Sequence, residues 1–360
     1  MAGTSDAEFM RRALTLAEAG WGRVHPNPLV SAVVVREGVV VGEGAHREFG
    51  GPHAEVEALR NAGDAAPGST LYVTLEPCAH HGKTPPCTTA ILDHGVARVV
   101  YAAADPHPDA AGGGTRLAER GVEVVGGVES EKARTQNALF LRPIETGRPF
   151  VALKYGLTLD ARIARAPGER TVVTGPESRA AVHRLRAGFD AVLVGARTAR
   201  IDDPLLTVRA APEPRVPPLR VVADPAATLA PDSALARSVD QAPVRVLVGA
   251  DAAPDRIQRL RDAGVDVAAV PGAGDHLDLA AALDRLWADG VRTVFCEGGG
   301  RLGAALLSAR RVDRLYLIYA PTIFGEAGVP AFPGAVEFRG KCVDVQSLGG
   351  DIQVTIDGGG

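Results

Sequence analysis

Cysteines are scarce in this sequence, and so are long apolar runs. Four cysteines among 360 residues are too few for a disulfide framework. The segment Met1 to Glu8 carries acidic residues and no apolar signal core, and apolar runs such as Ser31 to Val35 are far too short to cross a bilayer. We therefore expect a soluble protein of the reducing cytoplasm, with Cys296 and Cys342 as reduced packing residues.

The chain also lacks an excess of positive charge. Lysine and arginine total 39 against 43 acidic residues, which gives a net charge of −4 and a pI of about 6.2. Aromatic residues make up only 4% of the chain, and no basic patch is interleaved with them. This balance disfavours a nucleic-acid substrate. A small anionic molecule remains possible, because a few local arginines suffice to hold one phosphate.

What the chain does have is enough residues for two hydrophobic cores. Its 46% hydrophobic and 23% charged residues are ordinary for a globular protein, and a single core rarely extends beyond about 250–300 residues. Proline and polar residues interrupt the pattern near residues 142–149, and no internal repeat is visible. We therefore predict two domains, residues 1–145 and 149–360.

Both halves alternate between helical and strand patterns, which indicates an α/β class. Asp6 is expected to cap the first helix, and residues 25–28 to form a rigid extended segment, because each proline restrains its predecessor. In the first half, helices are expected over residues 6–18, 52–61, 86–94 and 116–120, and strands over 29–35, 39–44, 71–75, 96–103 and 122–125. In the second half, helices are expected over 177–187, 254–263, 279–289 and 301–309, and strands over 150–154, 171–174, 191–194, 220–223, 245–248, 265–270, 293–296, 315–319 and 352–356.

One histidine, one glutamate and two cysteines in the first half form the most informative pattern. His53 and Glu55 lie near the start of an expected helix, and Cys78 and Cys87 each follow a proline, which suggests that each cysteine opens a helix. One histidine and two cysteines can hold a zinc ion and leave its fourth position to water. Glu55 is offset from His53 on the helix and is free to move protons. The pattern predicts a zinc deaminase, in which activated water attacks an amino-bearing ring carbon.

A structural zinc site is the alternative interpretation of these residues. A closed structural site has four protein ligands, and His80 or His81 could supply the fourth. The order of the motifs and the expected hairpin before them favour catalysis. A structural zinc also needs no acid such as Glu55.

Three segments resemble the RibD family of bifunctional riboflavin-biosynthesis deaminase/reductases. They are His25-Pro26-Asn27-Pro28, His53-Ala54-Glu55-Val56 and the run from Thr74 to Cys87. The eight-residue gap between the two cysteines separates this family from cytidine and tRNA deaminases, which use a two-residue gap. The resemblance implies a cytidine-deaminase-like three-layer α/β/α domain followed by a dihydrofolate-reductase-like α/β domain, with Zn²⁺ and NADPH as cofactors and a homo-oligomeric assembly.

For the first domain, the resemblance implies the substrate 2,5-diamino-6-ribosylamino-4(3H)-pyrimidinone 5′-phosphate, whose 2-amino group is replaced by oxygen. Glu55 would be the catalytic acid and base, and His53, Cys78 and Cys87 the zinc ligands. The residues matched to the family's pyrimidine and phosphate pocket are Asn27, His46, His80, Lys83 and Asp105. Each of these, taken alone, is equally compatible with a polar loop residue.

The second half offers weaker clues of its own. Glu297 and three glycines follow an expected strand and precede a helix, where backbone amides can approach a phosphate, although a tight turn without a ligand has the same appearance. Residues 202–209 are expected to form a polar loop that enters a strand. Arg186 and Arg209 could clamp a phosphate, although surface arginines are usually solvated.

Resemblance to the RibD reductase domain extends these clues. It rests on Lys154-Tyr155-Gly156, Leu159-Asp160, His183-Arg184-Leu185-Arg186-Ala187, Asp202-Asp203-Pro204 and Glu297-Gly298-Gly299. That domain uses NADPH to reduce the ribosyl group of the deaminated product to ribityl. The implied substrate contacts are Lys154, Arg186, Leu206, Arg209 and Glu297. The implied NADPH contacts are Gly156, Thr198, Asp202, Gly298, Gly299, Gly300, Arg301, Leu302 and Gly303.

Several positions depart from the family pattern. In the first domain they are Ser31 for glycine, Glu57 for histidine and His107 for asparagine. In the second, Ala161 stands for glycine, a substrate-facing serine is replaced by Arg170 or deleted, and a cofactor-covering aromatic is replaced by Val172 or Thr171. The main hypothesis is a bifunctional enzyme. The alternatives are an active deaminase with an impaired or re-targeted reductase domain, a nucleic-acid base deaminase or binding module, and a non-catalytic zinc-stabilised protein.

Overall fold

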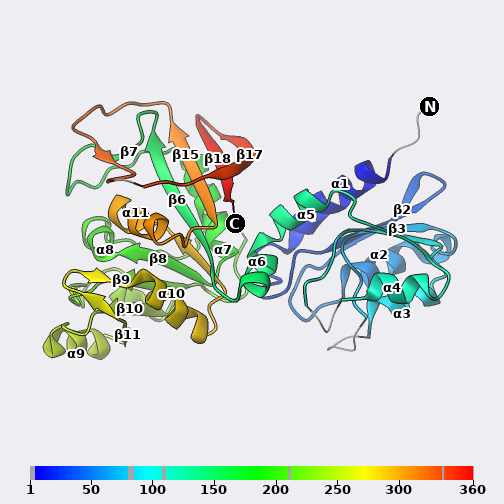
Figure 1. Ribbon diagram of the computed structural model, residues 1–360, viewed down its shortest axis with the longest axis horizontal. Helices are drawn as coiled ribbons and strands as arrows, with labels where there is room; N and C mark the ends of the chain where they lie inside the picture. Colours follow the sequence, from blue (N-terminus) through cyan, green and yellow to red (C-terminus); the bar gives the residue numbers. More distant parts are fainter. Residues whose placement is uncertain (1–4, 80–84, 108–110, 210–211, 335, 360) are drawn as a thin grey trace. The chain divides into compact units, whose positions relative to one another are not determined.

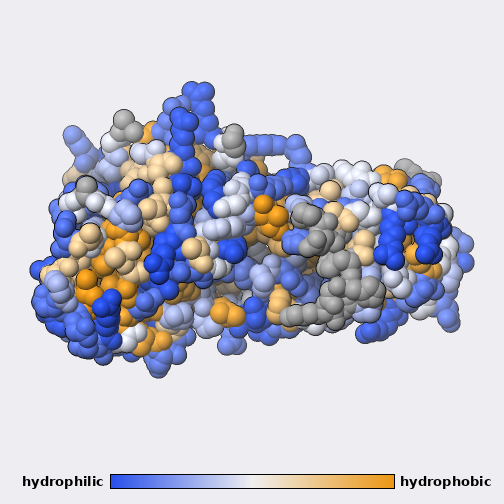
Figure 2. Space-filling model, turned by 60° about the horizontal axis from the view of Figure 1, so that its bottom comes forward, coloured by the Kyte–Doolittle hydropathy of each residue, from blue (hydrophilic) through white to orange (hydrophobic). Residues whose placement is uncertain are grey.

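The computed structural model describes residues 5–79, 85–107, 111–209, 212–334 and 336–359. The chain divides into two compact units, residues 1–146 and 147–360, and each is described by itself. Within the described ranges, no helix is both long enough and apolar enough to span a membrane. On the face drawn in Figure 2, hydrophilic residues separate the apolar patches from one another.

The first unit is built on a five-stranded sheet in the order β2-β1-β3-β4-β5. Strand β1 is antiparallel to β2 and β3, whereas β3, β4 and β5 are parallel. The β1–β2 hairpin turns at Glu37 and Gly38, as predicted. Both residues have a positive φ, which suits a two-residue hairpin turn. The strands are β1 Ser31–Arg36, β2 Val39–Ala45, β3 Thr70–Leu75, β4 Arg98–Ala103 and β5 Glu123–Gly126, and the α-helices are α1 Asp6–Ala17, α2 Ala54–Ala62, α3 Cys87–Asp93, α4 Gly113–Ala118, α5 Ser130–Gln136 and α6 Ala138–Thr146.

Helices cover both faces of this sheet (Figure 1). On one face, Leu59 of α2 and Ile91 of α3 pack with Leu71 of β3 in one hydrophobic cluster. On the other face, Met10 of α1 packs with Val33 of β1 in a second cluster. These clusters sandwich the sheet between helical layers, which confirms the predicted three-layer α/β/α arrangement.

The second unit has a nine-stranded sheet in the order β11-β10-β9-β8-β14-β6-β15-β18-β17. The strands from β11 to β15 are parallel to their neighbours, and β18 and β17 close the sheet in antiparallel pairing. The helices are α7 Pro176–Ala187, α8 Ala196–Asp202, α9 Pro254–Asp262, α10 Leu279–Ala288 and α11 Gly300–Ser308. The strands are β6 Phe150–Thr158, β7 Arg162–Ala164, β8 Ala191–Gly195, β9 Leu219–Ala223, β10 Val244–Val248, β11 Asp266–Ala269, β12 Gly272–Ala273, β13 His276–Leu277, β14 Thr293–Cys296, β15 Arg314–Ala320, β16 Val329–Pro330, β17 Gly340–Leu348 and β18 Asp351–Gly358.

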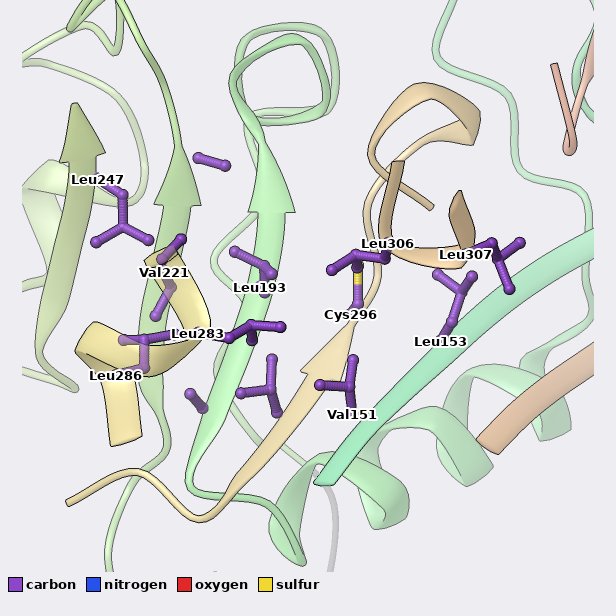
Figure 3. Packing of buried hydrophobic residues seen from close by; sticks show 14 of the residues in the cluster. Val151, Leu153, Leu193, Val221, Leu247, Leu283, Leu286, Cys296, Leu306 and Leu307 are labelled. Carbon is purple, nitrogen blue, oxygen red and sulfur yellow. The ribbon is translucent and has the colours of Figure 1, made fainter. Parts of the chain in front are cut away.

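Figure 3 shows the core on one face of this sheet. Leu306 and Leu307 of α11 and Leu283 of α10 share a cluster with Val151 and Cys296 of the central strands. The buried strands carry near-continuous apolar runs, as parallel strands covered on both faces do. The topology places the carboxyl ends of β6, β8 and β14 side by side, and ligands of open α/β sheets bind at such edges.

Some sequence predictions of local structure were wrong. Ser5 rather than Asp6 caps α1, because the Asp6 carboxylate accepts hydrogen bonds from Arg98 of β4 and Tyr72 of β3. His25 and Pro26 form a turn with a cis peptide bond instead of an extended segment. Cys342 is exposed, so it is no packing residue, whereas Cys296 is buried.

Other errors concern which segments are regular. Residues 171–174 form no strand, and the predictions missed α5, α6, α8 and β17. Residues 203–209 form the predicted loop, although Asp202 belongs to α8 and no strand begins within these residues. Pro143 was interpreted as the end of the first domain's pattern, but it lies inside α6. A proline can occupy a helix when the loss of one backbone hydrogen bond is offset by packing, and Pro143 is buried.

Candidate functional site

Three predicted metal ligands meet in the first unit. His53 is the N-cap residue of α2, Cys78 lies in the loop after β3, and Cys87 is the first residue of α3. Their ligand atoms all lie within 4.8 Å of one another, with His53 Nδ1 3.0 Å from Cys87 Sγ and 3.7 Å from Cys78 Sγ. Cys78 opens no helix in the described residues, so that prediction was wrong, but its sulfur still accepts the backbone N–H of Cys87.

The protonation behaviour of this cluster suits a zinc ion. Hydrogen bonds from Cys87 and from His53 lower the pKa of the Cys78 thiol to about 4, while the hydrogen bond to Cys78 and burial raise the pKa of Cys87. The lowered pKa favours the thiolate of Cys78, and a bound cation favours the second thiolate. Two sulfurs and one imidazole nitrogen form the donor set of a zinc site with an open fourth position.

Glu55 lies beside the ligands without belonging to them. It is in the first turn of α2 and only 3% exposed. Burial raises the pKa of its carboxyl, and its side chain hydrogen-bonds with Cys87. A carboxyl group whose pKa is raised by burial is suited to bind and release a proton, as a proton shuttle must.

A cavity of about 370 Å³ opens onto this cluster. It is lined by six predicted site residues, Asn27, His46, His53, Glu55, Cys78 and Asp105. Its size is in the range of small-molecule sites. The structure therefore brings together every predicted deaminase pocket residue that it describes; His80 and Lys83 lie outside the described residues.

His46 orients Asn27 within the cavity wall. Its Nδ1 lies 3.0 Å from the Pro52 carbonyl oxygen, which can only accept, so Nδ1 carries the proton. Its Nε2 lies 3.0 Å from Asn27 Nδ2 and therefore accepts from that amide. Burial lowers the pKa of His46, in keeping with a neutral ring. Both ring nitrogens are engaged, which fixes how the Asn27 amide is turned.

Glu76 is a pocket residue to which the sequence analysis gave no role. Its carboxylate is 8% exposed and accepts N–H groups from Asp105 at 3.4 Å, Gly112 at 3.2 Å and Gly114 at 3.0 Å. It thereby ties the loop after β4 to the loop that carries Cys78. An acid directly before a Pro-Cys ligand, with a glycine-rich loop downstream, was the available signal. Two aromatic rings in the cavity wall, Phe49 and Phe140, were also missed.

The three residues of the first unit that depart from the family pattern differ in their surroundings. Ser31 is buried and donates its hydroxyl to the Ala13 carbonyl, and Glu57 accepts the Ala45 N–H at 2.8 Å. Neither lines the cavity. His107 does line it, next to Asp105. Of the three departures, only the histidine changes a group that faces the cavity.

The second unit has a buried group of charges at the carboxyl ends of β6 and β14. The Glu297 carboxylate pairs with Arg186 of α7, which donates from Nε and, at 3.1 Å, from Nη2, and with Lys154 Nζ at 3.2 Å. Burial alone would raise the pKa of Glu297, but the charges of Arg186 and Lys154 outweigh it and lower the pKa to about 2. Three predicted substrate contacts therefore form one network.

The other predicted substrate contacts lie in the segment 203–209. Arg209 Nη1 donates to Thr207 Oγ1 at 3.2 Å, and its backbone N–H donates to His183 Nδ1 at 3.3 Å. Leu206 is 4% exposed and packs in the core, so any contact with substrate would come from its backbone. Arg186 also donates to the Thr207 carbonyl at 3.0 Å, which joins this segment to the charged network.

The predicted cofactor residues surround the turn from β14 into α11. The Gly299 N–H donates to Thr198 Oγ1 at 3.2 Å. A Cβ on Gly303 would lie 1.8 Å from the Tyr155 hydroxyl oxygen, so this glycine is required by close packing of α11 on β6. Burial raises the pKa of Asp202, the last residue of α8, and the charges of Arg170 and Lys154 oppose it. The remaining predicted cofactor residues are Gly156, Gly298, Gly300, Arg301 and Leu302.

Ala161 shows why the family pattern has glycine at this position. Its φ is 57°, a left-handed conformation that costs a residue with a Cβ about 1–2 kcal/mol. The neighbouring Asp160 carboxylate accepts the Gly325 N–H at 2.7 Å and so holds the turn. Val172, a position matched to the family's cofactor-covering aromatic residue, is 68% exposed.

Replacing Cys78 is expected to empty the zinc site. We expect the wild-type chain to retain about one zinc per chain after dialysis, and Cys78→Ala to retain little, because only two ligands remain. Atomic absorption on both proteins measures this. Cys342→Ala, which removes an exposed thiol far from the cluster in sequence, is the control and should keep its zinc. Full zinc retention by Cys78→Ala would contradict the assignment.

Known families match both units. Residues 4–103 match the cytidine and deoxycytidylate deaminase zinc-binding region, and residues 149–354 match the RibD C-terminal domain. The riboflavin biosynthesis protein RibD of Aquifex aeolicus is 40% identical over 356 residues, covering 97% of each chain. The protein of the same name from Escherichia coli is 37% identical over 368 residues, covering 96% of this chain and 98% of its own.

Solved structures agree over the same length. RibD of Acinetobacter baumannii superposes with a TM-score of 0.82 at 34% identity, covering 99% of each chain. A diaminohydroxyphosphoribosylaminopyrimidine deaminase/5-amino-6-(5-phosphoribosylamino)uracil reductase of Thermotoga maritima gives a TM-score of 0.81 at 35% identity, covering 98% of each chain.

Proposed function

Because the chain belongs to the RibD family of bifunctional deaminase/reductases of riboflavin biosynthesis, we propose which of its residues perform each reaction. Residues 1–145 deaminate 2,5-diamino-6-ribosylamino-4(3H)-pyrimidinone 5′-phosphate. Residues 149–360 reduce the ribosyl group of the product to ribityl with NADPH. The observation that carries this proposal is the convergence of His53, Cys78 and Cys87 beside buried Glu55 at one cavity.

In the deaminase half, His53, Cys78 and Cys87 would hold zinc, which would supply the Lewis acidity that makes water a nucleophile at neutral pH. Glu55 takes a proton from the attacking water and delivers it to the ring nitrogen; it then takes the proton of the added hydroxyl and delivers it to the amine, which departs as ammonia. Buried surroundings suit this exchange, because burial raises the pKa of the Glu55 carboxyl.

The rest of the deaminase pocket holds the substrate in place. Asn27, His46 and Asp105 line the cavity and bind the pyrimidine edges. His46 also orients Asn27, and Glu76 holds the backbone of Asp105. His80 and Lys83 complete the pocket by motif alone. Asparagine and aspartate offer hydrogen bonds to an aminopyrimidine, which presents donors and acceptors on its edges.

In the reductase half, NADPH supplies the hydride, and the protein positions the sugar. Lys154, Arg186 and Glu297 form the floor of the site, and Arg209 and the Leu206 backbone extend it. The positive charges of Arg186 and Arg209 suit an anionic substrate such as a phosphate ester.

Partners and location follow from the same family. The substrate is a small phosphorylated pyrimidine. Four free cysteines agree with a reducing cytoplasm, and we propose a homo-oligomer without nucleic-acid or membrane partners.

A second candidate function keeps the deaminase and changes the reductase. It is favoured by Ala161 in a left-handed conformation and by the exposed Val172 where an aromatic residue would cover the cofactor. Loss of one stacking face costs cofactor binding only about 1 kcal/mol. We therefore retain both activities as the main proposal.

A mass-resolved assay tests both halves together. Zinc-loaded protein with the diaminopyrimidine phosphate should give a product heavier by about one mass unit, from amine-to-oxygen exchange. Added NADPH should give a further gain of about two. The first gain without the second would support the re-targeted reductase, and no gain at all would contradict the proposal.

A further inference from the structure

Arg220 is a buried cation in the second unit that the described reaction does not use. It lies in β9, its side chain is fully buried, and its guanidinium donates to three carbonyls and one hydroxyl. Burial lowers its pKa to about 10. Removing a charged group from water is costly, so a buried arginine persists only where its hydrogen bonds compensate for the lost hydration.

One of those bonds reaches the segment that carries predicted substrate contacts. Arg220 Nη1 donates to the Leu205 carbonyl at 2.9 Å, and Leu205 precedes Leu206. The same nitrogen donates to Ser238 Oγ at 2.7 Å, and Nη2 donates to the Ser238 carbonyl at 2.6 Å and to the Ala242 carbonyl. The guanidinium thus joins the segment 203–209 to the turn before β10.

The segment 203–209 needs such support because it has no helix or strand of its own. Asp203 and Leu206 have φ angles of 38° and 53°, in the left-handed region. Residues held in this region are strained and persist only where their surroundings hold them. Leu206 is held on one side by its buried side chain and on the other by the neighbouring carbonyl that Arg220 binds.

The segment is coupled to the charged network on its other side. Arg186 donates to the Thr207 carbonyl at 3.0 Å and pairs with Glu297. Arg220 and Arg186 therefore bind carbonyls two residues apart on one short segment. If the Leu205 carbonyl moves, both Leu206 and the Thr207 carbonyl are displaced, and Arg209 follows.

We propose that Arg220 is a positioning residue of the reductase, which fixes the segment 203–209 so that Leu206 and Arg209 meet the anionic substrate. Arg220 itself is buried beneath the segment and does not touch substrate. The inference rests on the proposed reductase function for its kinetic consequences. Its structural consequence, order in the segment, stands without it.

Two variants and one matched control test the role. Arg220→Lys keeps a charge, but its single nitrogen has three donors and cannot replace the four hydrogen bonds that Nη1 and Nη2 make, and Arg220→Met removes them all. Arg314→Met is the control, because Arg314 is also buried and pairs with Asp357 in the same unit, but between β15 and β18. Backbone hydrogen–deuterium exchange, reductase KM and kcat, NADPH affinity and Tm are measured for each.

We expect faster exchange in residues 203–209 and in the turn at Ser238 and Ala242, and a KM for the deaminated substrate raised at least about tenfold in both Arg220 variants, with a smaller change in kcat. Arg314→Met should lower Tm while leaving exchange in the segment and KM as in the wild type. If Arg220→Met does not fold, Arg220→Lys decides. A folded Arg220→Lys protein with wild-type exchange and KM would overturn the proposal.

The exchange experiment separates this inference from the proposed function. It uses the full chain without substrate, so it reports on the segment whether or not the wild type reduces the ribosyl group. A wild-type protein without reductase activity would count against the proposed function. Unchanged exchange in both Arg220 variants would count against the positioning role.

Discussion

Glu55→Gln is expected to abolish deamination while leaving zinc in place. The amide has nearly the shape of the carboxylate but cannot take a proton from water, and general acid–base catalysis contributes up to about 10,000-fold. Glu55 is not among the three ligand residues that cluster around the metal position. Zinc content, NADPH affinity and reduction of supplied deaminated substrate should therefore match the wild type. Mass-resolved product formation and atomic absorption measure the two sides of this expectation.

Glu57→Gln is the matched control for this variant. Glu57 lies two residues further along α2 and accepts the Ala45 N–H, outside the cavity lining. It should deaminate at close to the wild-type rate. Deamination by Glu55→Gln at near the wild-type rate would show that another group moves the proton, and loss of its zinc would show that Glu55 supports the metal instead.

The metal cluster could be predicted because its residues are read from short motifs at the starts of regular elements. His53 caps α2 and Cys87 opens α3. The helix predicted at Cys78 was wrong for a physical reason: a proline restricts its own φ and the residue before it, whatever follows. Pro77-Cys78 and Pro86-Cys87 therefore look alike in sequence, although only the second precedes a helix in the described residues.

Features that depend on distant partners could not be predicted. Asp6 and Ser5 are both good capping residues, and the choice between them is made by Arg98 and Tyr72, which use the Asp6 carboxylate. His46 stays a predicted substrate contact, but the hydrogen bonds that its two ring nitrogens make with Pro52 and Asn27 are visible only in the fold. In each case the deciding contact is tertiary.

The fold class of both units could be predicted, but the buried charges of the second unit could not be interpreted from sequence. The strand pattern of the central sheet is apolar and continuous, so it was visible. The sequence analysis gave Arg220 no role, because an arginine is usually exposed. Its burial is possible only because carbonyls of two separate loops accept its hydrogen bonds. The family resemblance implied Lys154, Arg186 and Glu297 as separate substrate contacts. Only the fold shows that Glu297 pairs with both cations.

Glu297→Gln is expected to cost the reductase at least about 100-fold in kcat/KM, because it removes the carboxylate that faces two buried cations. Breaking a buried pair by removing one partner costs about 3–5 kcal/mol, and a displaced Arg186 would also release the Thr207 carbonyl. Deamination should be unchanged, since Glu55 and its cavity belong to the other unit. Steady-state assays of both reactions on one preparation measure the contrast.

Asp313→Asn separates this effect from general loss of stability. The Asp313 side chain is 4% exposed and pairs with Arg148, much as the 7% exposed Glu297 pairs with Arg186. Both variants should lower Tm, but only Glu297→Gln should lose reductase activity in protein that is still folded. Equal activity losses at equal Tm would mean that Glu297 serves stability alone.

The pH dependence of stability below pH 4.5 gives an independent test of the role of the Glu297 carboxylate. The pKa of Glu297 in the folded protein is lowered to about 2, so its ionised form stabilises the fold above its ordinary pKa of 4.5. That contribution is lost as pH falls from 4.5 toward 2. Glu297→Gln should therefore flatten the pH dependence of Tm in this window relative to the wild type. An unchanged slope would show that the two cations do not hold Glu297 ionised.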